Sequence, residues 1–241
     1  MERSLSSVML AEAYGTFLLT FIGATSITVA SDANLFSVGP TLGLGFVGLA
    51  HGLALLAGIA SVGSISGGYF NPAITFAAFT AGRFPKSRVL PYVVAQFAGA
   101  ILGAAVELAM VGMTAASIPG VDLGSNLPNT ALPNFLFAAV LAEIVGTTFL
   151  TMAVLGSTDK ESSGIPWASS SIGLVLAASI WALASVSGAS LNPARSFGPA
   201  IISLVFNIGT APISYYWIYV VGPVLGALLA AMLYRLIYKR A

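Results

Sequence analysis

The sequence predicts an all-α membrane protein with six transmembrane helices and two half-helices that enter the membrane without crossing it. The first observation is composition: 57% of the 241 residues are hydrophobic and 7% are charged, whereas soluble domains carry about 25% charged residues. So few charged side chains cannot cover a water-facing surface of this size, which excludes a soluble protein. The second observation is six long apolar segments, and the third is two shorter ones that open with the same tripeptide.

Each long segment holds the roughly 20 mostly apolar residues that a helix needs to cross a bilayer. In chain order the predicted spans are residues 8–30, 40–60, 89–113, 135–155, 167–186 and 213–233. The first is longer than the apolar core of a secretory signal, which has about 7–15 residues, and no small-residue cleavage motif follows it. We therefore interpret it as a retained span.

The two shorter apolar stretches, 72–81 and 193–205, reach only about halfway across a bilayer at ~1.5 Å per residue. Asparagine is a favoured N-cap and proline a favoured first helical residue, so an Asn-Pro-Ala tripeptide predicts a helix start. Small, flexible residues at 64–68 and 185–190 precede them and allow the chain to fold back. The tripeptides are Asn71, Pro72 and Ala73, and Asn192, Pro193 and Ala194.

The two halves of the chain form a repeat. Ala-Glu-Ala-Tyr-Gly-Thr at 11–16 returns as Ala-Glu-Ile-Val-Gly-Thr at 142–147, and the Asn-Pro-Ala triplets lie 121 residues apart. Because each half contains three spans, an odd number, the second half must be inverted in the membrane relative to the first. We expect one transmembrane domain over 1–241, with repeats at about 8–113 and 135–238, whose half-helices meet N-terminus to N-terminus near the midplane.

The basic residues predict the orientation. Three loops on one side, 31–39, 114–134 and 207–212, contain no lysine or arginine, which makes that side external and both termini cytoplasmic by the positive-inside rule. Arg195 alone falls inside the membrane, in the first turn of the second half-helix. The other eight basic residues all fall on the opposite, cytoplasmic side. They are Arg3, Arg83, Lys86, Arg88, Lys160, Arg235, Lys239 and Arg240.

Several kinds of chemistry are excluded. The chain has no cysteine and a single histidine, His51, so disulfides and thiol catalysis are absent and a zinc or haem site lacks ligands. We expect neither a metal nor a cofactor. A net charge of +1 without a run of like charges predicts no nucleic-acid partner.

These motifs resemble the aquaporin, or major intrinsic protein, family over essentially the whole chain. The resemblance rests on the opening motif of both halves, on Ser-Gly-Gly-Tyr-Phe-Asn-Pro-Ala-Ile-Thr at 66–75, on Gly-Ala-Ser-Leu-Asn-Pro-Ala-Arg-Ser-Phe-Gly-Pro-Ala at 188–200, on Gln96 and on Gly222-Pro223. Tyr69 stands where a histidine is common, and Val220 where the water-selective branch usually has an aromatic residue. The family implies a passive channel rather than an enzyme, and a homotetramer.

The resemblance gives the two asparagines a second role besides capping. Each amide of Asn71 and Asn192 would donate to the oxygen of a passing water, while the positive ends of both half-helix dipoles repel cations and protons. This barrier is known for aquaporins in general.

The resemblance also places Arg195 in the outer selectivity filter, although a cation near a span end can instead extend to the interface. His51, by itself in an apolar helix, has a plain packing role as its alternative. The whole predicted filter looks more like the vacuolar (tonoplast) branch than strict water channels. It consists of His51, Ile180, Ala189 and Arg195.

Ser196 and Ala200 resemble the water-channel branch, where glycerol facilitators usually carry an aspartate and a basic residue. Carboxylates inside spans are costly unless they are paired or hydrogen-bonded. We expect Glu12 and Glu143 to brace the re-entrant loops together with Gln96, with a proton relay as the alternative. Glu107 has no assigned role.

The predicted function is a passive channel in a lipid bilayer that conducts water and small neutral solutes such as ammonia and excludes protons and ions. The alternatives are a glycerol or small-solute facilitator of the same fold, an ion-coupled transporter, an intramembrane hydrolase that uses Ser187 or Ser190 with His51, and a non-conducting adhesive protein. The expected location is the plasma membrane, with a vacuolar-type membrane as the alternative.

Overall fold

The computed structural model describes residues 3–32, 39–159 and 168–238, and this part of the chain is helical without strands. Six of its helices are long and apolar enough to cross a membrane: α1, α2, α4, α5, α6 and α9. The predicted fold class is therefore confirmed. In order, the helices are α1 Leu5–Ser31, α2 Gly39–Ser66, α3 Pro72–Thr80, α4 Lys86–Ala116, α5 Phe135–Ser157, α6 Ala168–Ser187, α7 Pro193–Val205, α8 Ala211–Ser214 and α9 Ile218–Ile237.

Two predicted boundaries need correction. The second span continues from 60 to Ser66, because the chain stays helical until Gly67 takes a left-handed conformation with φ 97°, which favours glycine at a helix end. The last span begins at Ile218 instead of 213, since Ala211–Ser214 forms the separate short helix α8 and a turn follows it. Trp167, Lys160, Lys239 and Arg240, which entered the predictions above, lie outside the described residues.

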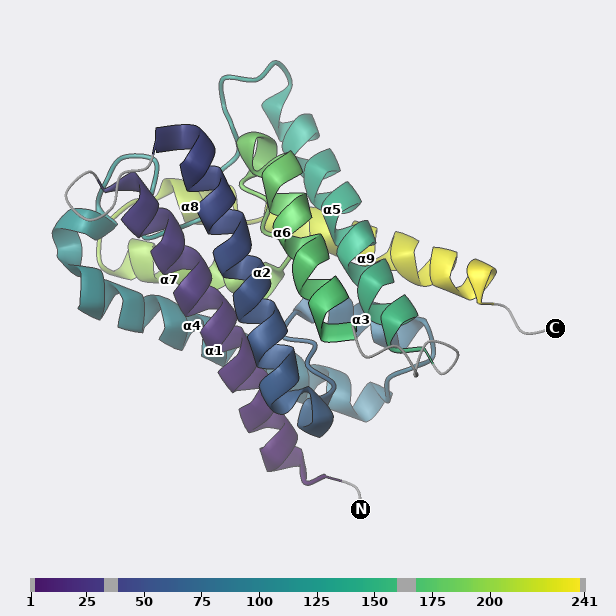
Figure 1. The fold of residues 1–241 in the computed structure, drawn as a ribbon. Coiled ribbons are helices and arrows are strands. Elements are labelled where there is room, and N and C mark those ends of the chain that lie inside the picture. The colour runs from purple at the N-terminus through teal and green to yellow at the C-terminus, as the bar shows by residue number, and fades with distance from the viewer. Residues whose placement is uncertain (1–2, 33–38, 160–167, 239–241) are drawn as a thin grey trace.

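The two predicted halves interlock. Helix α1 packs on α2 and α4, α5 packs on α6 and α9, and α2 packs on α6 across the boundary between the halves. Each half-helix also contacts a span from the other half, because α3 lies against α9 and α7 lies against α4. Figure 1 shows α1, α2, α6 and α5 side by side, with the half-helices behind them.

Close helix approach depends on glycines that face a neighbouring backbone. A Cβ on Gly99 of α4 would lie 2.1 Å from the carbonyl oxygen of Ala13 in α1, and one on Gly226 of α9 would lie 2.3 Å from that of Ile144 in α5. These two contacts occupy corresponding places in the two halves. Gly99 and Gly226 therefore serve packing within the chain.

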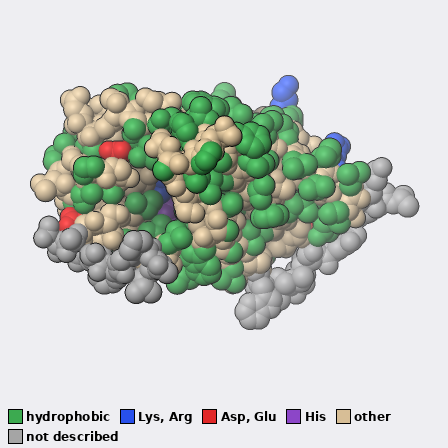
Figure 2. All heavy atoms as spheres, turned by 90° about the horizontal axis from the view of Figure 1, so that it is seen from above, with side chains coloured by type: hydrophobic (Ala, Val, Ile, Leu, Met, Phe, Trp, Pro, Cys, Tyr) green, Lys and Arg blue, Asp and Glu red, His purple; other side chains and the backbone are tan. Residues whose placement is uncertain are grey.

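Hydrophobic side chains cover much of the face that Figure 2 shows. Large side chains such as Leu10, Leu90, Phe137 and Leu174 are more than half exposed, which suits contact with lipid. At one end of the molecule Arg83 donates to the carbonyl oxygens of Leu155 (2.5 Å) and Thr158 (2.6 Å) and lies 5.4 Å from the ring of Tyr234. The α3–α4 loop and the ends of α5 and α9 therefore meet at that end.

Candidate functional site

The half-helices α3 and α7 begin opposite each other, and their capping asparagines are bonded crosswise. Nδ2 of Asn71 donates to the carbonyl oxygen of Leu191 (2.7 Å), and Nδ2 of Asn192 donates to that of Phe70 (2.8 Å). The Oδ1 atoms cap their own helices, Asn71 through the N–H of Ala73 and Asn192 through two N–H groups of its first turn. An amide nitrogen carries two hydrogens, so each asparagine keeps one N–H for a molecule beside it.

Glu12 is fully buried and holds the loop that leads into α3. Its Oε1 accepts hydrogen bonds from Ser66 Oγ (2.6 Å) and from the N–H of Tyr69 (3.1 Å). Its Oε2 accepts from the N–H of Phe70 (2.7 Å) and from Gln96 Nε2 (2.7 Å). Four donors on one carboxylate fix the backbone immediately before Asn71 and compensate for burial of the charge.

Glu143 does the same for the loop before α7. Its Oε1 accepts from Ser187 Oγ (2.8 Å) and from the N–H of Ser190 (2.9 Å), and its Oε2 accepts from the N–H of Leu191 (2.7 Å). The two loops also share their backbone shape, because residues 67, 68 and 70 have positive φ, and so do 188, 189 and 191. Both half-helices are thus held by the same arrangement.

Two tyrosines brace these loops as well, and the sequence reasoning missed them. The hydroxyl of Tyr92 in α4 donates to the carbonyl oxygen of Ser66, and that of Tyr219 in α9 donates to the carbonyl oxygen of Ser187, both at 2.7 Å. The available signal was their matching position in the third span of each half.

The glycine of each Ala-Glu-x-x-Gly-Thr motif makes room for the residue before the asparagine. A Cβ on Gly15 would lie 2.0 Å from the Phe70 ring, and one on Gly146 would lie 2.5 Å from a Leu191 methyl group. Each motif therefore provides a carboxylate that accepts hydrogen bonds from the loop and a glycine that leaves space for the side chain before the asparagine.

We expect Gly15→Ala to lower the free energy of unfolding by about 1–3 kcal/mol, because overpacking forces Phe70 out of place. The measurement is thermal unfolding of the detergent-solubilised protein. Gly45→Ala is the matched control, since nothing lies within 4 Å of a Cβ at Gly45 and alanine favours a helix by up to about 1 kcal/mol. Equal melting temperatures for the two variants would contradict this account.

Arg195 is 1% exposed and belongs to the first turn of α7, where three groups accept from its guanidinium. Nη1 donates to the carbonyl oxygen of Gly124 (3.1 Å) and to Oδ1 of Asn126, and Nη2 donates to His51 Nε2 (2.9 Å). Nε is without a partner among the described residues. Asn126 is another residue that the sequence reasoning missed, because it belongs to the long loop 117–134.

These contacts fix the hydrogen positions on His51. Its Nδ1 lies 2.9 Å from the carbonyl oxygen of Val47, which can only accept, so Nδ1 carries the hydrogen. Its Nε2 faces the guanidinium of Arg195, which can only donate, so Nε2 accepts. The ring is therefore neutral, with both nitrogens engaged. Gly23 makes room for it, since a Cβ there would lie 2.4 Å from Nε2.

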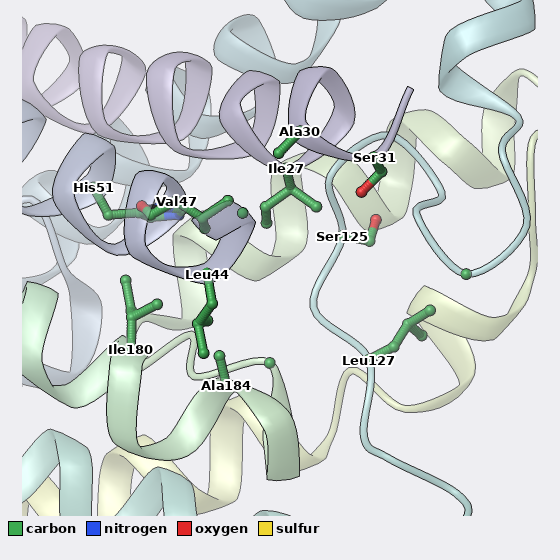
Figure 3. Close-up of a pocket in the computed structure, with 13 residues that line it drawn as sticks. Ile27, Ala30, Ser31, Leu44, Val47, His51, Ser125, Leu127, Ile180 and Ala184 are labelled. Atoms are coloured by element: carbon green, nitrogen blue, oxygen red, sulfur yellow. Dashed lines mark hydrogen bonds between the residues drawn. The ribbon is translucent and has the colours of Figure 1, made fainter. Parts of the chain in front are cut away.

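Three cavities lie in series along one path through the molecule. The one we call outer lies at the end that was predicted to be external. It has about 490 Å³, is mostly apolar and is lined by His51 and Ile180 among others. Figure 3 shows Ile180 of α6 and His51 of α2 on opposite walls. A narrow cavity of about 10 Å³ shares His51 with the outer one and Tyr69 with an inner one of about 470 Å³. Space of about 10–15 Å³ holds one water molecule.

Both polar and apolar residues line the narrow cavity. The polar ones are Arg195, Asn71, Asn192 and Ser190, together with the two shared residues. In Figure 2 the histidine is visible in purple at the floor of a hollow, beside a blue side chain. Ala189 is 3% exposed and is not among the described lining residues of either the outer or the narrow cavity. The apolar lining residues are Leu19, Leu55, Ile74, Leu150 and Leu176.

Glu107 lies apart from this path. It is fully buried, its Oε1 accepts from Thr28 Oγ1 (2.7 Å), and its Oε2 has no partner among the described residues. In the part of the chain that the structure describes, no group of three or more His, Asp or Glu side chains could hold a metal ion.

Comparison with known proteins gives consistent matches over the whole chain. A family model described as major intrinsic protein matches residues 2–234. Aquaporin AqpM of Methanothermobacter marburgensis is 39% identical over 96% of this chain and 97% of its own. Probable aquaporin AqpM of Archaeoglobus fulgidus is 38% identical over 99% and 100%, and glycerol uptake facilitator protein-like 6 of Lactiplantibacillus plantarum is 33% identical over 94% and 95%.

Among solved structures, the aquaglyceroporin from Plasmodium falciparum superposes with a TM-score of 0.83 over 96% of both chains. At 24% sequence identity this likeness supports the fold alone. The likeness of the filter to the vacuolar branch is untested by these relatives and stays a prediction.

Proposed function

The chain belongs to the major intrinsic protein family, and from this premise we propose that it is a passive channel for water and small neutral solutes such as ammonia. It excludes protons and ions, and it is not an enzyme. The observation that carries the proposal is the series of three cavities whose narrow part has room for one water molecule.

The polar lining residues of the narrow cavity supply a water molecule with donors at defined places. The free N–H groups of Asn71 and Asn192 donate to the water oxygen at the half-helix starts, where both helix dipoles are positive. A water held there by its oxygen directs its hydrogens away from the asparagines, so a chain of waters cannot relay a proton through this point. The apolar lining residues offer a water molecule no further hydrogen-bond partners, so the water binds weakly and passes quickly.

In addition to the positive ends of the half-helix dipoles, a fixed positive charge forms a second barrier to cations. The guanidinium of Arg195 lies at the outer end of the narrow cavity, beside a histidine that is neutral and fully engaged. A fixed positive charge in a low-dielectric wall repels cations over several ångströms. This arrangement disfavours the ion-coupled transporter.

The glycerol facilitator is retained as the second candidate, because one relative of 33% identity carries that name and the outer cavity is mostly apolar. We also propose that both termini are cytoplasmic, that the protein lies in the plasma membrane, and that it is a homotetramer. Native mass spectrometry in detergent tests the oligomer, and protease access to the termini in sealed vesicles tests the orientation.

Stopped-flow light scattering on proteoliposomes tests the main proposal. We expect osmotic water flux well above that of protein-free vesicles without any ion gradient, ammonia entry detected by internal alkalinisation, and no added proton flux after a pH jump. Glycerol entry as fast as water entry would favour the facilitator. Water flux no greater than that of protein-free vesicles would overturn the proposal.

Ile180 is proposed to set the preference for ammonia. Because Ile180 places an apolar side chain opposite His51, we expect Ile180→His to lower ammonia flux more than water flux: an added imidazole narrows the opening and favours water, which exchanges hydrogen bonds on both sides. Parallel measurements in proteoliposomes give the ratio of the two fluxes. If both fall by the same factor, the substitution acts as a plug, and Ile180 is not a selectivity residue.

A further inference from the structure

Tyr69 occupies a junction at the inner end of the channel that mirrors the place of His51 at the outer end. It lines both the narrow cavity and the inner cavity of about 470 Å³. A solute that leaves the narrow part toward the inner side must therefore pass this ring. None of the residues assigned to the outer filter lines the described part of the inner cavity.

The Tyr69 ring is held rigidly in this position. It packs edge-to-face against Phe84 (5.2 Å between ring centres) and Tyr92 (6.1 Å), which also pack against each other at 4.8 Å. On another side a Cβ at Gly67 would lie 2.8 Å from the ring. The backbone N–H donates to Glu12, so the residue is fixed at both ends.

Its hydroxyl, in contrast, makes no hydrogen bond to a described residue, and it is not among the described buried polar atoms that lack a partner. Tyr69 itself lines the inner cavity. The 121-residue spacing of the repeat relates Tyr69 to Ser190, whose hydroxyl donates to the carbonyl oxygen of Asn192 and contacts Ser196. Among the described residues the Tyr69 hydroxyl thus has no hydrogen-bond partner, whereas the hydroxyl of its counterpart has partners in two residues.

The same spacing relates Arg195 to Ile74, an apolar residue of the narrow cavity. At its inner end the narrow cavity therefore has no cation corresponding to Arg195 among its described lining residues, although Arg83 lines the inner cavity beyond it. There the Tyr69 hydroxyl remains as a polar group able both to donate to and to accept from a passing molecule.

We propose that Tyr69 forms a second selectivity constriction at the inner end of the narrow channel, where its ring limits solute size and its hydroxyl replaces one hydrogen bond of a passing water. This inference rests on the proposed channel function. Two constrictions act in series, so their resistances add, and the inner one controls solute size once the outer one has been widened.

The test therefore uses a background in which Ile180→Ala widens the outer end. Adding Tyr69→Ala should raise the ratio of glycerol flux to water flux by about tenfold, which corresponds to about 1.4 kcal/mol of barrier. Adding Tyr69→Phe should lower water flux and glycerol flux alike by about threefold, within the usual net worth of one hydrogen bond, and so leave that ratio unchanged. Tyr14→Ala is the matched control, because Tyr14 is 47% exposed on the outer surface of α1.

Size-exclusion chromatography and water flux establish that each variant is folded. If the folded Tyr69→Ala double variant passes glycerol no faster relative to water than Ile180→Ala alone, the inference is wrong. It is equally wrong if Tyr14→Ala raises the ratio as much. If the unmodified protein conducts no water at all, the proposed function fails instead, so the two failures are distinct. Tyr69→Phe keeps the ring packing and tests the hydroxyl even if Tyr69→Ala does not fold.

Discussion

Replacing Arg195 by valine is expected to raise cation and proton leak through the channel by one to three orders of magnitude while water flux persists. Two unit charges about 4 Å apart interact by about 4 kcal/mol at an effective dielectric constant near 20, and each 1.4 kcal/mol is a factor of about ten. Water in the channel and the remaining half-helix dipoles reduce the effect, which gives the lower bound. The measurement is the rate of pH and potential dissipation in proteoliposomes.

The Arg195→Val variant should stay folded, because channel water can bond to the acceptors that lose the guanidinium, which are Gly124 O, Asn126 Oδ1 and His51 Nε2. Arg235→Val is the control, since Arg235 is an exposed cation in the last turn of α9 and lies outside the narrow cavity. If a folded Arg195→Val protein still excludes cations as well as the unmodified protein does, Arg195 is not part of the barrier.

Glu143→Gln is expected to abolish conduction and to lower thermal stability strongly. Both oxygens of Glu143 accept hydrogen bonds. In either orientation of the glutamine amide, its NH₂ group would therefore face a loop N–H or hydroxyl that now donates to the carboxylate. Each buried donor left without a partner costs about 1–3 kcal/mol. The loop before Asn192 would lose its fixed shape, and with it the start of α7. Thermal unfolding and water flux measure the two effects.

Glu107→Gln is the matched control for this change. Glu107 is as deeply buried, but only its Oε1 accepts a hydrogen bond and its Oε2 has no partner among the described residues. A glutamine can keep its oxygen toward Thr28 and place its amide nitrogen where no donor opposes it. We expect Glu107→Gln to conduct water normally. Comparable losses in both variants would show that buried charge, and not loop bracing, matters at Glu143.

The sequence was sufficient for the fold because the signals for it are local. Twenty apolar residues in a row predict a span wherever the chain later goes, and Asn71-Pro72 and Asn192-Pro193 predict helix starts from the chemistry of capping alone. The spans and half-helices were found this way. The errors in the predicted spans were confined to their ends. At the start of α9, for example, a short helix and a turn look as apolar in sequence as the span that follows.

The roles predicted for the filter residues remain predictions, but the structure shows which side chains they meet. Asn126 approaches Arg195 across 69 residues of chain, and Tyr92 reaches Ser66 across 26. No periodicity links such pairs, because a contact between distant segments depends on how the helices pack against one another. The same holds for Gly15 and Phe70, whose fit is visible only when both are in place.

The sequence by itself therefore determined the membrane setting, the inverted repeat, the half-helix starts and the presence of Arg195, Glu12 and Glu143 at depth. These features follow from composition and short-range chemistry. Only the tertiary structure decided which nitrogen of His51 carries its hydrogen, which loop holds Arg195, and that Tyr69 lies where the narrow and inner cavities meet. Those features depend on the direction of side chains, and packing between segments far apart in the chain sets that direction.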